Sequence, residues 1–493
     1  MAQEIELKLQ LTAKTARQLL KHPLLAALPA KKQDLLNTYY DTADLALTQR
    51  RIALRFRKKG EDWLLTVKSA EPAAGGLAVR SEWECPARPG EINFSHVDRP
   101  DLQDFLEQRQ AELTPIFTTH FRRTAWLVEH GDSQIELALD QGEVESCGRR
   151  DPISEIELEL ISGRISDLFA LTRILQADLA LYPAIASKAE RGYALFHDTP
   201  PLPVKGRPVP LPADESPVIA FRRIALACLE HYQRNEAGLL RGESEYVHQA
   251  RVALRKLRSA LKLFSPVLPD DFVTTWSAAW RELAAALGET RDWDVLLEDT
   301  LPPLVATFPA HPEIKRLLKR ARRGQKQARR RLQDHLVAGH HPRQLINFVA
   351  AVLELPEPQP ATDLREFAWQ RLKKRESQAL ALAGAHARLD DREWHSLRIE
   401  IKKLRYALDF FSLLLPGNRL RAYQRALTQL QDSLGRFNDQ CTALALAADC
   451  LGASQAGPVQ GWLAGQHALL REILPEQLLA WQAQSLPKPA DDE

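Results

Sequence analysis

The 493-residue sequence has few cysteines and no long apolar run, and each scarcity excludes a class of protein. Its five cysteines show neither a CxxC pair nor the ligand spacing of a zinc module. That excludes a disulfide framework and predicts a reducing cytoplasm. No stretch of about 18 apolar residues occurs, so we expect no membrane span. The first residues are acidic and alternating rather than basic and then apolar, so we expect no signal peptide.

Length and charge indicate more than one domain. A single hydrophobic core rarely serves 493 residues, so two or three domains are expected. The net charge is only +2, but it is unevenly distributed. Residues 1–197 carry 25 Lys and Arg against 29 Asp and Glu, whereas residues 198–493 carry 41 against 35. The second part of the chain is therefore the one expected to meet anionic partners.

A proline-rich segment divides the chain. Residues 198–217 hold seven prolines in twenty positions, which predicts a semi-rigid linker rather than a helix or a central strand. Before it, in residues 1–197, strand-like alternation is interrupted by helical patterns. This predicts an α+β domain in which helices cover an antiparallel sheet or barrel. After it, residues 218–485 follow the helical period almost throughout, which predicts an all-α domain.

The predicted helical domain contains an internal duplication. The matching pairs are residues 247–264 with 394–411 and residues 287–295 with 434–442, both at an offset of 147. Two separate matches that share one offset indicate a duplicated unit. A second proline-rich break at 354–363 lies between the copies. We therefore expect two repeats, at about 218–353 and 363–485, arranged as a two-lobed helical bundle.

Charged residues occupy alternate positions in the predicted strands of the first domain. Residues 4–11, EIELKLQL, place Glu4, Glu6 and Lys8 on one face and aliphatic residues on the other. Six strands share this habit. Spacing alone leaves open a solvated face and a barrel with a polar interior and a helix-covered exterior. In a barrel, Arg and Lys would bind phosphates while carboxylates hold a divalent cation, as phosphoryl transfer requires.

The motifs on these strands follow one another in a specific order. They are ExExK at 4–8, YYDT at 39–42, LRFR at 54–57, TVK at 66–68, RSEWE at 80–84, ELALDQG at 136–142, EIELEL at 155–160 and SKAERGY at 187–193. This series resembles the CYTH superfamily, the triphosphate tunnel metalloenzymes. The resemblance implies an eight-stranded antiparallel β tunnel with covering helices that hydrolyses a triphosphate with Mg²⁺ or Mn²⁺.

The resemblance also implies roles for single residues. The implied metal ligands are Glu4, Glu6, Glu157 and Glu159, with Glu155 as an accessory acid. The implied triphosphate-binding residues are Lys8, Arg55, Arg57, Lys68, Arg80, Arg123 and Lys188. A carboxylate would orient the attacking water, and both Glu82 and Glu84 remain candidates, while Lys8 also counts among the catalytic groups.

Basic residues form a stripe on one helix in each repeat. The first stripe is His248, Arg251, Arg255, Arg258 and Lys262, and the second is His395, Arg398, Lys402 and Arg405, with Asp409 in place of the last lysine. Their spacing places each set on one helix face. A solvated face normally mixes charge signs, so two nearly one-signed stripes predict a track for an anion.

A third basic segment, residues 315–332, holds ten Lys and Arg and no acid. A nucleic-acid patch is one interpretation of such a run. The segment has no aromatic residue on which a base could stack, however, and phosphate chains would suit it equally well.

The duplicated H-x-x-R-x-x-x-[RK]-K-x-R helices and the two LG-x-x-x-D stretches resemble the CHAD domain, a helical module that often follows a CYTH domain. The resemblance implies binding of inorganic polyphosphate along the basic faces, with association with polyphosphate granules as a further expectation.

The two resemblances, together with these patterns, imply a cytoplasmic inorganic triphosphatase that cleaves tripolyphosphate to pyrophosphate and phosphate, with a helical domain that binds polyphosphate. Nucleic acid and membrane are not expected partners. One alternative is a nucleoside or thiamine triphosphatase, or an adenylyl cyclase, on the same tunnel. The other is a non-catalytic polyphosphate-binding protein.

Overall fold

The computed structural model describes residues 2–70, 75–88, 90–198, 201–356, 363–384, 389–415, 417–452 and 457–488. The chain folds into two compact units. The first comprises Met1–Leu202 together with Ala338–Glu354, and the second comprises Pro203–Val337 together with Leu355–Glu493.

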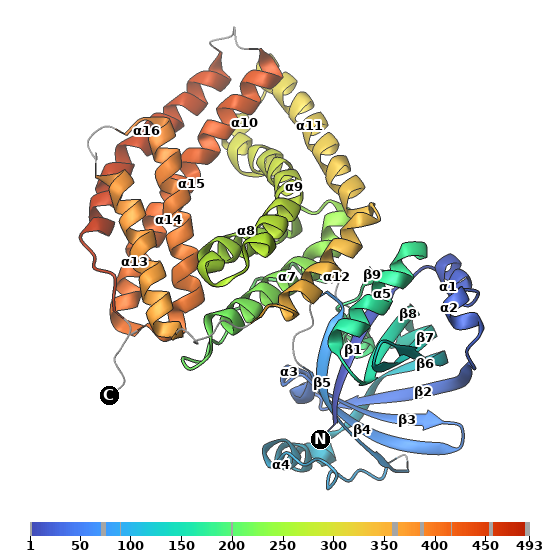
Figure 1. The fold of residues 1–493 in the computed structure, drawn as a ribbon. Coiled ribbons are helices and arrows are strands. Elements are labelled where there is room, and N and C mark those ends of the chain that lie inside the picture. Colours follow the sequence, from blue (N-terminus) through green and yellow to red (C-terminus); the bar gives the residue numbers. More distant parts are fainter. Residues whose placement is uncertain are drawn as a thin grey trace. The chain divides into compact units, whose positions relative to one another are not determined.

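The first unit is built on a closed antiparallel barrel (Figure 1). Its strands are β1 (Ala2–Gln10), β2 (Lys31–Asp41), β3 (Ile52–Lys59), β4 (Asp62–Ala70), β5 (Leu77–Pro86), β6 (Thr114–His130), β7 (Ser133–Ser146) and β8 (Arg149–Ser162). The order is β5-β4-β3-β2-β6-β7-β8-β1, and β1 also pairs with β5, which closes the ring. A short β9 (Tyr182–Pro183) adds to β1. The predicted α+β barrel with covering helices is confirmed.

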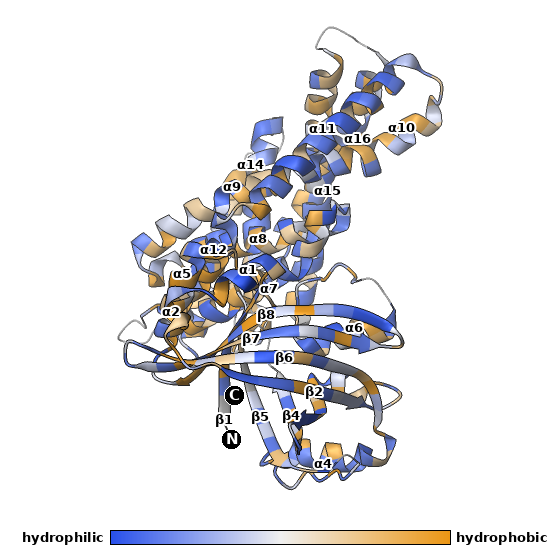
Figure 2. Ribbon diagram, turned by 90° about the vertical axis from the view of Figure 1, so that its right-hand side faces the viewer, coloured by the Kyte–Doolittle hydropathy of each residue, from blue (hydrophilic) through white to orange (hydrophobic). Residues whose placement is uncertain are grey.

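Both faces of β1 are buried, which explains how a strand with alternating charges is stable. Leu7 and Leu9 have no exposed surface, while Glu6 and Lys8, on the other face, are 3% and 4% exposed. Figure 2 shows the same alternation of hydrophilic and hydrophobic segments along neighbouring strands. The aliphatic residues therefore face the covering elements and the charged residues face the interior, so the solvated-face interpretation is wrong for this strand.

Helices pack around this barrel, and the amino terminus of one of them, α6 (Lys188–His197), reaches into its interior. They are α1 (Ala13–Leu19), α2 (Pro23–Ala26), α3 (Ala46–Gln49), α4 (Pro100–Arg109), α5 (Ile165–Asp178), α6 (Lys188–His197) and α12 (His340–Leu353). The last of these comes from far along the chain, between the two helical repeats, yet it packs against α5 and β9. Arg343 on α12 donates hydrogen bonds to the carbonyls of Gln176 and Ala177. No sequence pattern predicted this return of the chain to the first unit.

The regular secondary structure described in the second unit is all helical, and a non-helical segment, residues 203–216, precedes its first helix. It consists of α7 (Pro217–Arg241), α8 (Ser244–Phe264), α9 (Asp270–Val295), a π-helical turn (Leu296–Thr300), α10 (Leu301–Thr307), α11 (Pro312–Val337), α13 (Leu364–Ala383), α14 (Asp391–Phe411), α15 (Gly417–Leu451) and α16 (Pro458–Gln482). The predicted all-α class is confirmed.

The duplicated helices α8 and α14 pack against each other. The rings of Phe264 and Phe411, which are 147 residues apart, lie 5.7 Å from each other between centroids. Equivalent positions of the two copies therefore meet at the centre of this unit.

Candidate functional site

The barrel encloses a cavity of about 690 Å³, which we call the tunnel cavity. Its charged lining comprises Glu4, Glu6, Lys8, Arg55, Arg57, Lys68, Glu82, Glu84, Asp98, Arg123, Glu157, Glu159 and Lys188. Most of these residues come from alternate positions of barrel strands. Lys188 is the first residue of α6, whose amino terminus also presents Ser187 and Ala189. The structure thus places in one cavity all the described predicted metal ligands, phosphate-binding residues and candidate catalytic carboxylates, whereas the accessory acid Glu155 is fully buried outside the lining.

Carboxylates gather in one part of the tunnel cavity. Glu6 and Glu159 are directly paired residues of β1 and β8, and Glu159 is also paired with Glu136 of β7. Burial, together with the negative charges of Glu4, Glu136 and Glu6, raises the pKa of Glu159 to about 7 despite nearby Lys68. The raised pKa shows that nearby cations do not compensate the negative charge of these carboxylates. Carboxylate oxygens are also the donors that a hard divalent cation prefers. Glu4, Glu6, Glu159 and Glu136 therefore have the donor chemistry of a hard divalent-cation site, and their role as metal ligands stays a prediction.

Arginines crowd another part of the same cavity. Burial and the nearby charges of Arg55 and Arg123 lower the pKa of Arg57 to about 10. Arg57 donates through Nε to the Asn37 amide oxygen at 3.0 Å, and Arg55 donates to the Tyr39 hydroxyl at 3.3 Å. Arg55 also lies 3.5 Å from Glu82, whereas Arg57 lies 3.9 Å from Glu84 and is the guanidinium whose pKa is lowered. An incoming polyanion would supply the missing negative charge.

A second group of carboxylates holds cations in place. The Lys188 ammonium lies 2.7 Å from Asp140, 2.5 Å from Glu155 and 2.9 Å from Glu157. Arg123 forms a bidentate pair with Asp140 at 2.8 and 2.7 Å and also contacts Glu157. The oxygens of these three acids are close enough together to hold a metal ion. Because the lysine ammonium already contacts all three, we assign them to orienting Lys188 and Arg123.

Glu157 was predicted as a metal ligand, and the structure surrounds it with basic groups. Its Oε1 lies 2.9 Å from Lys8 and from Lys188, and its Oε2 contacts Arg123. Burial opposes ionisation, but Lys188, Lys8 and Arg123 outweigh it and hold the pKa of Glu157 well below its usual range. As a metal ligand, Glu157 stays a prediction.

The two candidate catalytic carboxylates differ in their partners. Glu82 contacts Lys68 at 2.8 Å and Arg55 at 3.5 Å. These two cations outweigh burial and lower its pKa. Glu84 accepts a hydrogen bond from the Thr66 hydroxyl at 2.9 Å. Either residue could orient a water, so the choice between them remains open.

Two further predicted residues complete the description. Lys68 also contacts Glu4, at 2.7 Å, and thereby ties the acidic group to the arginine side of the cavity. Arg80 lies in β5 opposite Glu4, but its side chain falls outside the described part of the structure.

The ELALDQG motif contains Glu136 and Asp140, to which the sequence interpretation gave no role. A signal was available, because both alternate with apolar residues on β7 as Glu157 and Glu159 do on β8. Asp41 proves to be structural: it accepts hydrogen bonds from the backbone of Leu47 and Thr48 and from the Tyr193 hydroxyl.

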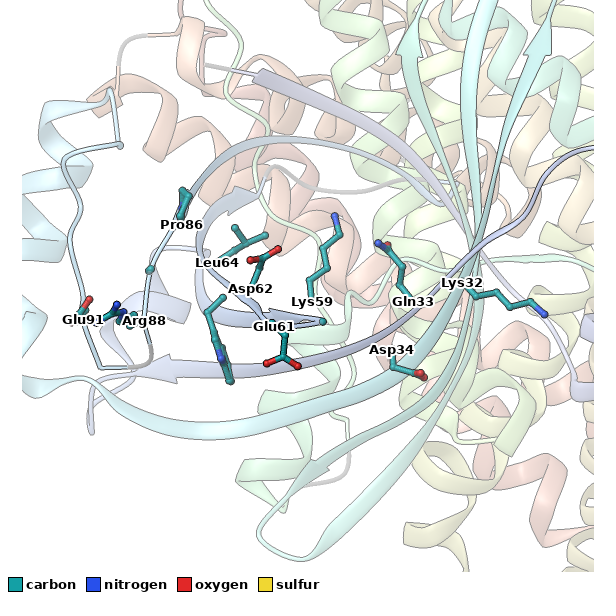
Figure 3. Close-up of a pocket in the computed structure, with 13 residues that line it drawn as sticks. Lys32, Gln33, Asp34, Lys59, Glu61, Asp62, Leu64, Pro86, Arg88 and Glu91 are labelled. Carbon is teal, nitrogen blue, oxygen red and sulfur yellow. The ribbon is translucent and has the colours of Figure 1, made fainter.

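A larger, open groove of about 1270 Å³ lies beside the start of β2, the hairpin between β3 and β4, and the loop that follows β5 (Figure 3). Lys59 lies two residues beyond Arg57 and hence on the same face of β3. The groove mixes Lys32, Lys59 and Arg88 with Asp34, Glu61, Asp62 and Glu91. These charged residues are all exposed, whereas Glu6, Lys8, Arg55 and Lys188 of the tunnel cavity are buried, so the candidate site stays with the tunnel cavity.

In the helical unit, the two predicted stripes meet and form one cluster. We call Arg251 and Arg255 of α8 with Arg398 and Lys402 of α14 the basic cluster. Burial, reinforced by the positive charges of Arg255, Arg398 and Arg251, lowers the pKa of Lys402 to about 6. A buried ammonium that loses its proton this readily lacks sufficient counter-charge.

Two aspartates at equivalent positions face the basic cluster. Asp292 on α9 lies 3.8 Å from Arg251, and Asp439 on α15 interacts electrostatically with Arg398 and Lys402. Gly288 lies one turn before Asp292, and a Cβ there would be 3.9 Å from the Arg251 Nε. The duplicated LG-x-x-x-D stretch thus supplies partial counter-charge and open space beside the cations.

Other residues of the stripes lie outside this cluster. Burial lowers the pKa of Arg258, whose charged neighbour is Arg281, and Lys262 lies near Lys403. His248 lies near Arg291, His395 contacts Asn438 at 3.0 Å, and Arg405 hydrogen-bonds Gln431. Asp409, which replaces the last lysine, lies 3.7 Å from Lys256 and 3.9 Å from Arg405.

The third basic segment forms α11. One face of this helix buries Leu317, Ala321, Ala328 and Leu332, and Arg329 pairs with Asp294 at 2.8 Å. The exposed basic residues are Lys315, Arg316, Lys319, Arg320, Arg322, Arg323, Lys326, Arg330 and Arg331. None of the helices in the described part of the chain combines the length and hydropathy that a bilayer crossing requires.

Known proteins resemble both units. An inorganic triphosphatase of Haemophilus influenzae is 38% identical over 196 residues, which cover 40% of this chain and 55% of that relative. The match thus spans little more than half of that relative's length. The crystal structure of the CHAD domain from the plant Ricinus communis is 28% identical, covers 59% of this chain and 99% of that one, and has a TM-score of 0.51.

The structure of a putative adenylyl cyclase from Hippeastrum, HpAC1, described as having a dominant triphosphatase activity, is 21% identical. It covers 40% of this chain and 95% of that one with a TM-score of 0.30, which is too low to carry an argument. The family model of the CYTH domain matches residues 2–193, and that of the CHAD domain matches residues 223–448. The chain therefore contains a region that matches the CYTH domain, followed by one that matches the CHAD domain.

Proposed function

We propose that this chain is a divalent-metal-dependent inorganic triphosphatase that cleaves tripolyphosphate to pyrophosphate and phosphate. The observation that carries the proposal is the arrangement of charge inside the tunnel cavity, where the carboxylates that raise the pKa of Glu159 to about 7 lie in the same chamber as Arg57, whose pKa burial and neighbouring arginines lower to about 10. A metal–triphosphate complex supplies both missing charges at once. The similarity to a triphosphatase over the first domain supports the same conclusion.

The residues divide the work of the reaction. Glu4, Glu6 and Glu159, with Glu136, would hold a Mg²⁺ or Mn²⁺ ion, which when bound would neutralise the negative charge that develops on the phosphates. Arg55, Arg57, Arg123 and Lys188 bind the phosphate chain, as Arg80 does by family resemblance. Asp140, Glu155 and Glu157 fix Arg123 and Lys188 in place, so the phosphates meet a preorganised set of donors.

Lys8 and Lys68 connect the two charge groups. Lys8 lies 3.5 Å from Glu6 and 2.9 Å from Glu157, and Lys68 contacts both Glu4 and Glu82. Each ammonium can therefore turn from a carboxylate to a phosphate oxygen when substrate enters. Glu82 or Glu84 then orients the water for attack on the terminal phosphorus, in line with the departing pyrophosphate.

Substrate profiling tests this assignment. Phosphate release from tripolyphosphate, ATP and thiamine triphosphate is measured with Mg²⁺ or Mn²⁺. We expect tripolyphosphate to give the highest kcat/KM, since charged side chains suited to phosphate and metal make up most of the described cavity lining. Faster turnover of ATP or thiamine triphosphate would favour the alternative triphosphatases. No release from any of the three would leave the tunnel a non-catalytic phosphate-binding site.

We further propose that the basic cluster binds inorganic polyphosphate. Four buried or half-buried cations from two helices, opposed by only two aspartates, leave a positive charge that a linear polyanion can neutralise. Such binding would also carry the protein to polyphosphate granules.

Charge reversal separates the two domains' roles. Replacing Arg251, Arg255 and Arg258 with Glu should weaken long-chain polyphosphate binding and leave tripolyphosphate hydrolysis intact. The matched control reverses Arg322 and Arg323 on the exposed face of α11. If long-chain binding persists at moderate salt in the α8 variant but disappears in the α11 control, the anion track lies on α11.

A further inference from the structure

Three side chains of metal-ligand type meet in the second repeat, away from the tunnel cavity. Asp391 is the first residue of α14, Cys441 lies in α15 and His467 lies in α16. One ligand atom from each can be chosen so that all three lie within 4.8 Å of one another. The three residues are far apart in sequence, so no spacing motif revealed them.

The distances suit a metal ion better than a hydrogen bond. His467 Nε2 and Asp391 Oδ2 are 3.4 Å apart, and this buried nitrogen has no hydrogen-bond partner in the described structure. Zinc bonds of about 2.0–2.3 Å at a tetrahedral angle place neighbouring ligand atoms roughly 3.3–3.7 Å apart. The observed separation therefore matches one edge of a coordination tetrahedron.

Neighbouring groups orient these ligands. The ring of Phe437 packs on the His467 imidazole at 4.4 Å between centroids, which fixes the plane of the imidazole. Arg471 lies 3.7 Å from one carboxylate oxygen of Asp391, Oδ1. The other oxygen, Oδ2, is the one that faces His467. Outer partners of this kind commonly position metal ligands.

The first repeat has an ion pair at the position equivalent to Cys441. Cys441 corresponds by the offset of 147 to Asp294, which is fully buried and paired with Arg329 of α11 at 2.8 Å. The position equivalent to Arg329 is Glu476, so the second repeat has no such ion pair. A thiol facing a histidine and an aspartate replaces a charge pair between helices.

We propose that Asp391, Cys441 and His467 bind a zinc-class divalent cation that ties α14, α15 and α16 together. A thiolate, an imidazole and one carboxylate form a mixed S, N, O set that favours Zn²⁺ over Mg²⁺ or Ca²⁺. The Asp391 side chain is 49% exposed, which leaves a fourth position open to water. Asp391 also lies one turn before His395, so the bound cation would add positive charge close to the polyphosphate stripe of α14.

Cobalt substitution in the full-length chain tests the site. Under reducing conditions, Co²⁺ should bind with a thiolate-to-cobalt charge-transfer band, and Zn²⁺ should displace it. The Cys441→Ser variant should lose the band, and His467→Gln should bind Co²⁺ at least about tenfold more weakly. Neither readout depends on triphosphate hydrolysis or on the metal site of the tunnel, which has no thiol.

Two cysteine variants serve as matched controls. Cys450→Ser removes a buried thiol from the same helix, and Cys85→Ser removes the thiol that lies 3.4 Å from His96 Nδ1. Both should retain the band. The proposal is overturned if the native chain shows no thiolate band, or if the band disappears with Cys85 rather than with Cys441. Should Cys441→Ser fail to fold, an unchanged Co²⁺ affinity in His467→Gln is the overturning result.

Discussion

Replacing Glu159 with Gln should stabilise the metal-free tunnel domain while abolishing its response to metal. In the folded chain the pKa of this carboxyl is about 7, against an ordinary value of 4.5. Ionising this carboxyl lowers the free energy of unfolding. The loss is absent below about pH 4.5 and complete above about pH 7. A shift of that size corresponds to an upper limit of roughly 3 kcal/mol. Because the group is partly exposed, solvent screening reduces the expected gain to about 1–2 kcal/mol.

Calorimetric unfolding measures this effect. The tunnel-domain transition is identified as the one that Mn²⁺ raises in the native chain. In EDTA at pH 8, Glu159→Gln should raise that transition by a few degrees, since about 1 kcal/mol shifts the melting temperature of a domain of this size by roughly 2–4 °C. At pH 4.5 the two proteins should melt together.

In saturating Mn²⁺ the tunnel domain of the native chain should melt at a higher temperature than that of Glu159→Gln, the reverse of the order in EDTA. A ligand at one hundred times its Kd stabilises the native state by about 2.7 kcal/mol, and the variant should gain little of this. Glu129→Gln, on the exposed face of β6, is the matched control and should change neither transition. If Glu159→Gln destabilises the metal-free domain at pH 8, or stabilises it equally at both pH values, the carboxylate group is not an electrostatically strained cation site.

Three further outcomes are expected. Replacing Glu4 and Glu6 with Gln should abolish metal-dependent turnover with an unchanged circular dichroism spectrum, and retained activity would remove both as ligands. Polyphosphate binding to the helical domain at pH 8 should take up about one proton, because a nearby polyanion raises the lowered pKa of Lys402. Titration calorimetry in two buffers of different ionisation enthalpy measures this uptake, and Lys402→Met should eliminate it. Gly192→Ala should lower tripolyphosphate turnover but not polyphosphate binding. Its Cβ would lie 2.2 Å from the Phe117 ring, so α6, which carries Lys188, would have to move. Turnover equal to that of the native chain would show that α6 tolerates this shift.

Much of the fold could be predicted because local periodicity is written directly into the sequence. Glu4, Glu6 and Lys8 share a strand face, and Arg251, Arg255 and Arg258 share a helix face, in any structure that forms those elements. The burial of Leu7 and Leu9 on the opposite face of β1 confirms the first pattern. The common offset of 147 likewise predicted equivalent helices, which the structure contains.

Periodicity says nothing about which other surface a face will meet. Glu157 shares its strand face with Glu159, yet one is surrounded by cations and the other by carboxylates, because β1, β6 and α6 bring different side chains to each. That difference depends on contacts between residues far apart in the chain, and no window of the sequence contains them.

The sequence by itself determined the element types, the charged faces and the duplication. The tertiary structure alone decided that the two basic stripes form one cluster, that α12 returns to the barrel, and that Asp391, Cys441 and His467 converge. The physical reason is the same in each case. The face a side chain occupies follows from backbone geometry within one element, whereas its neighbours across a packed interface follow from the burial of all the elements together.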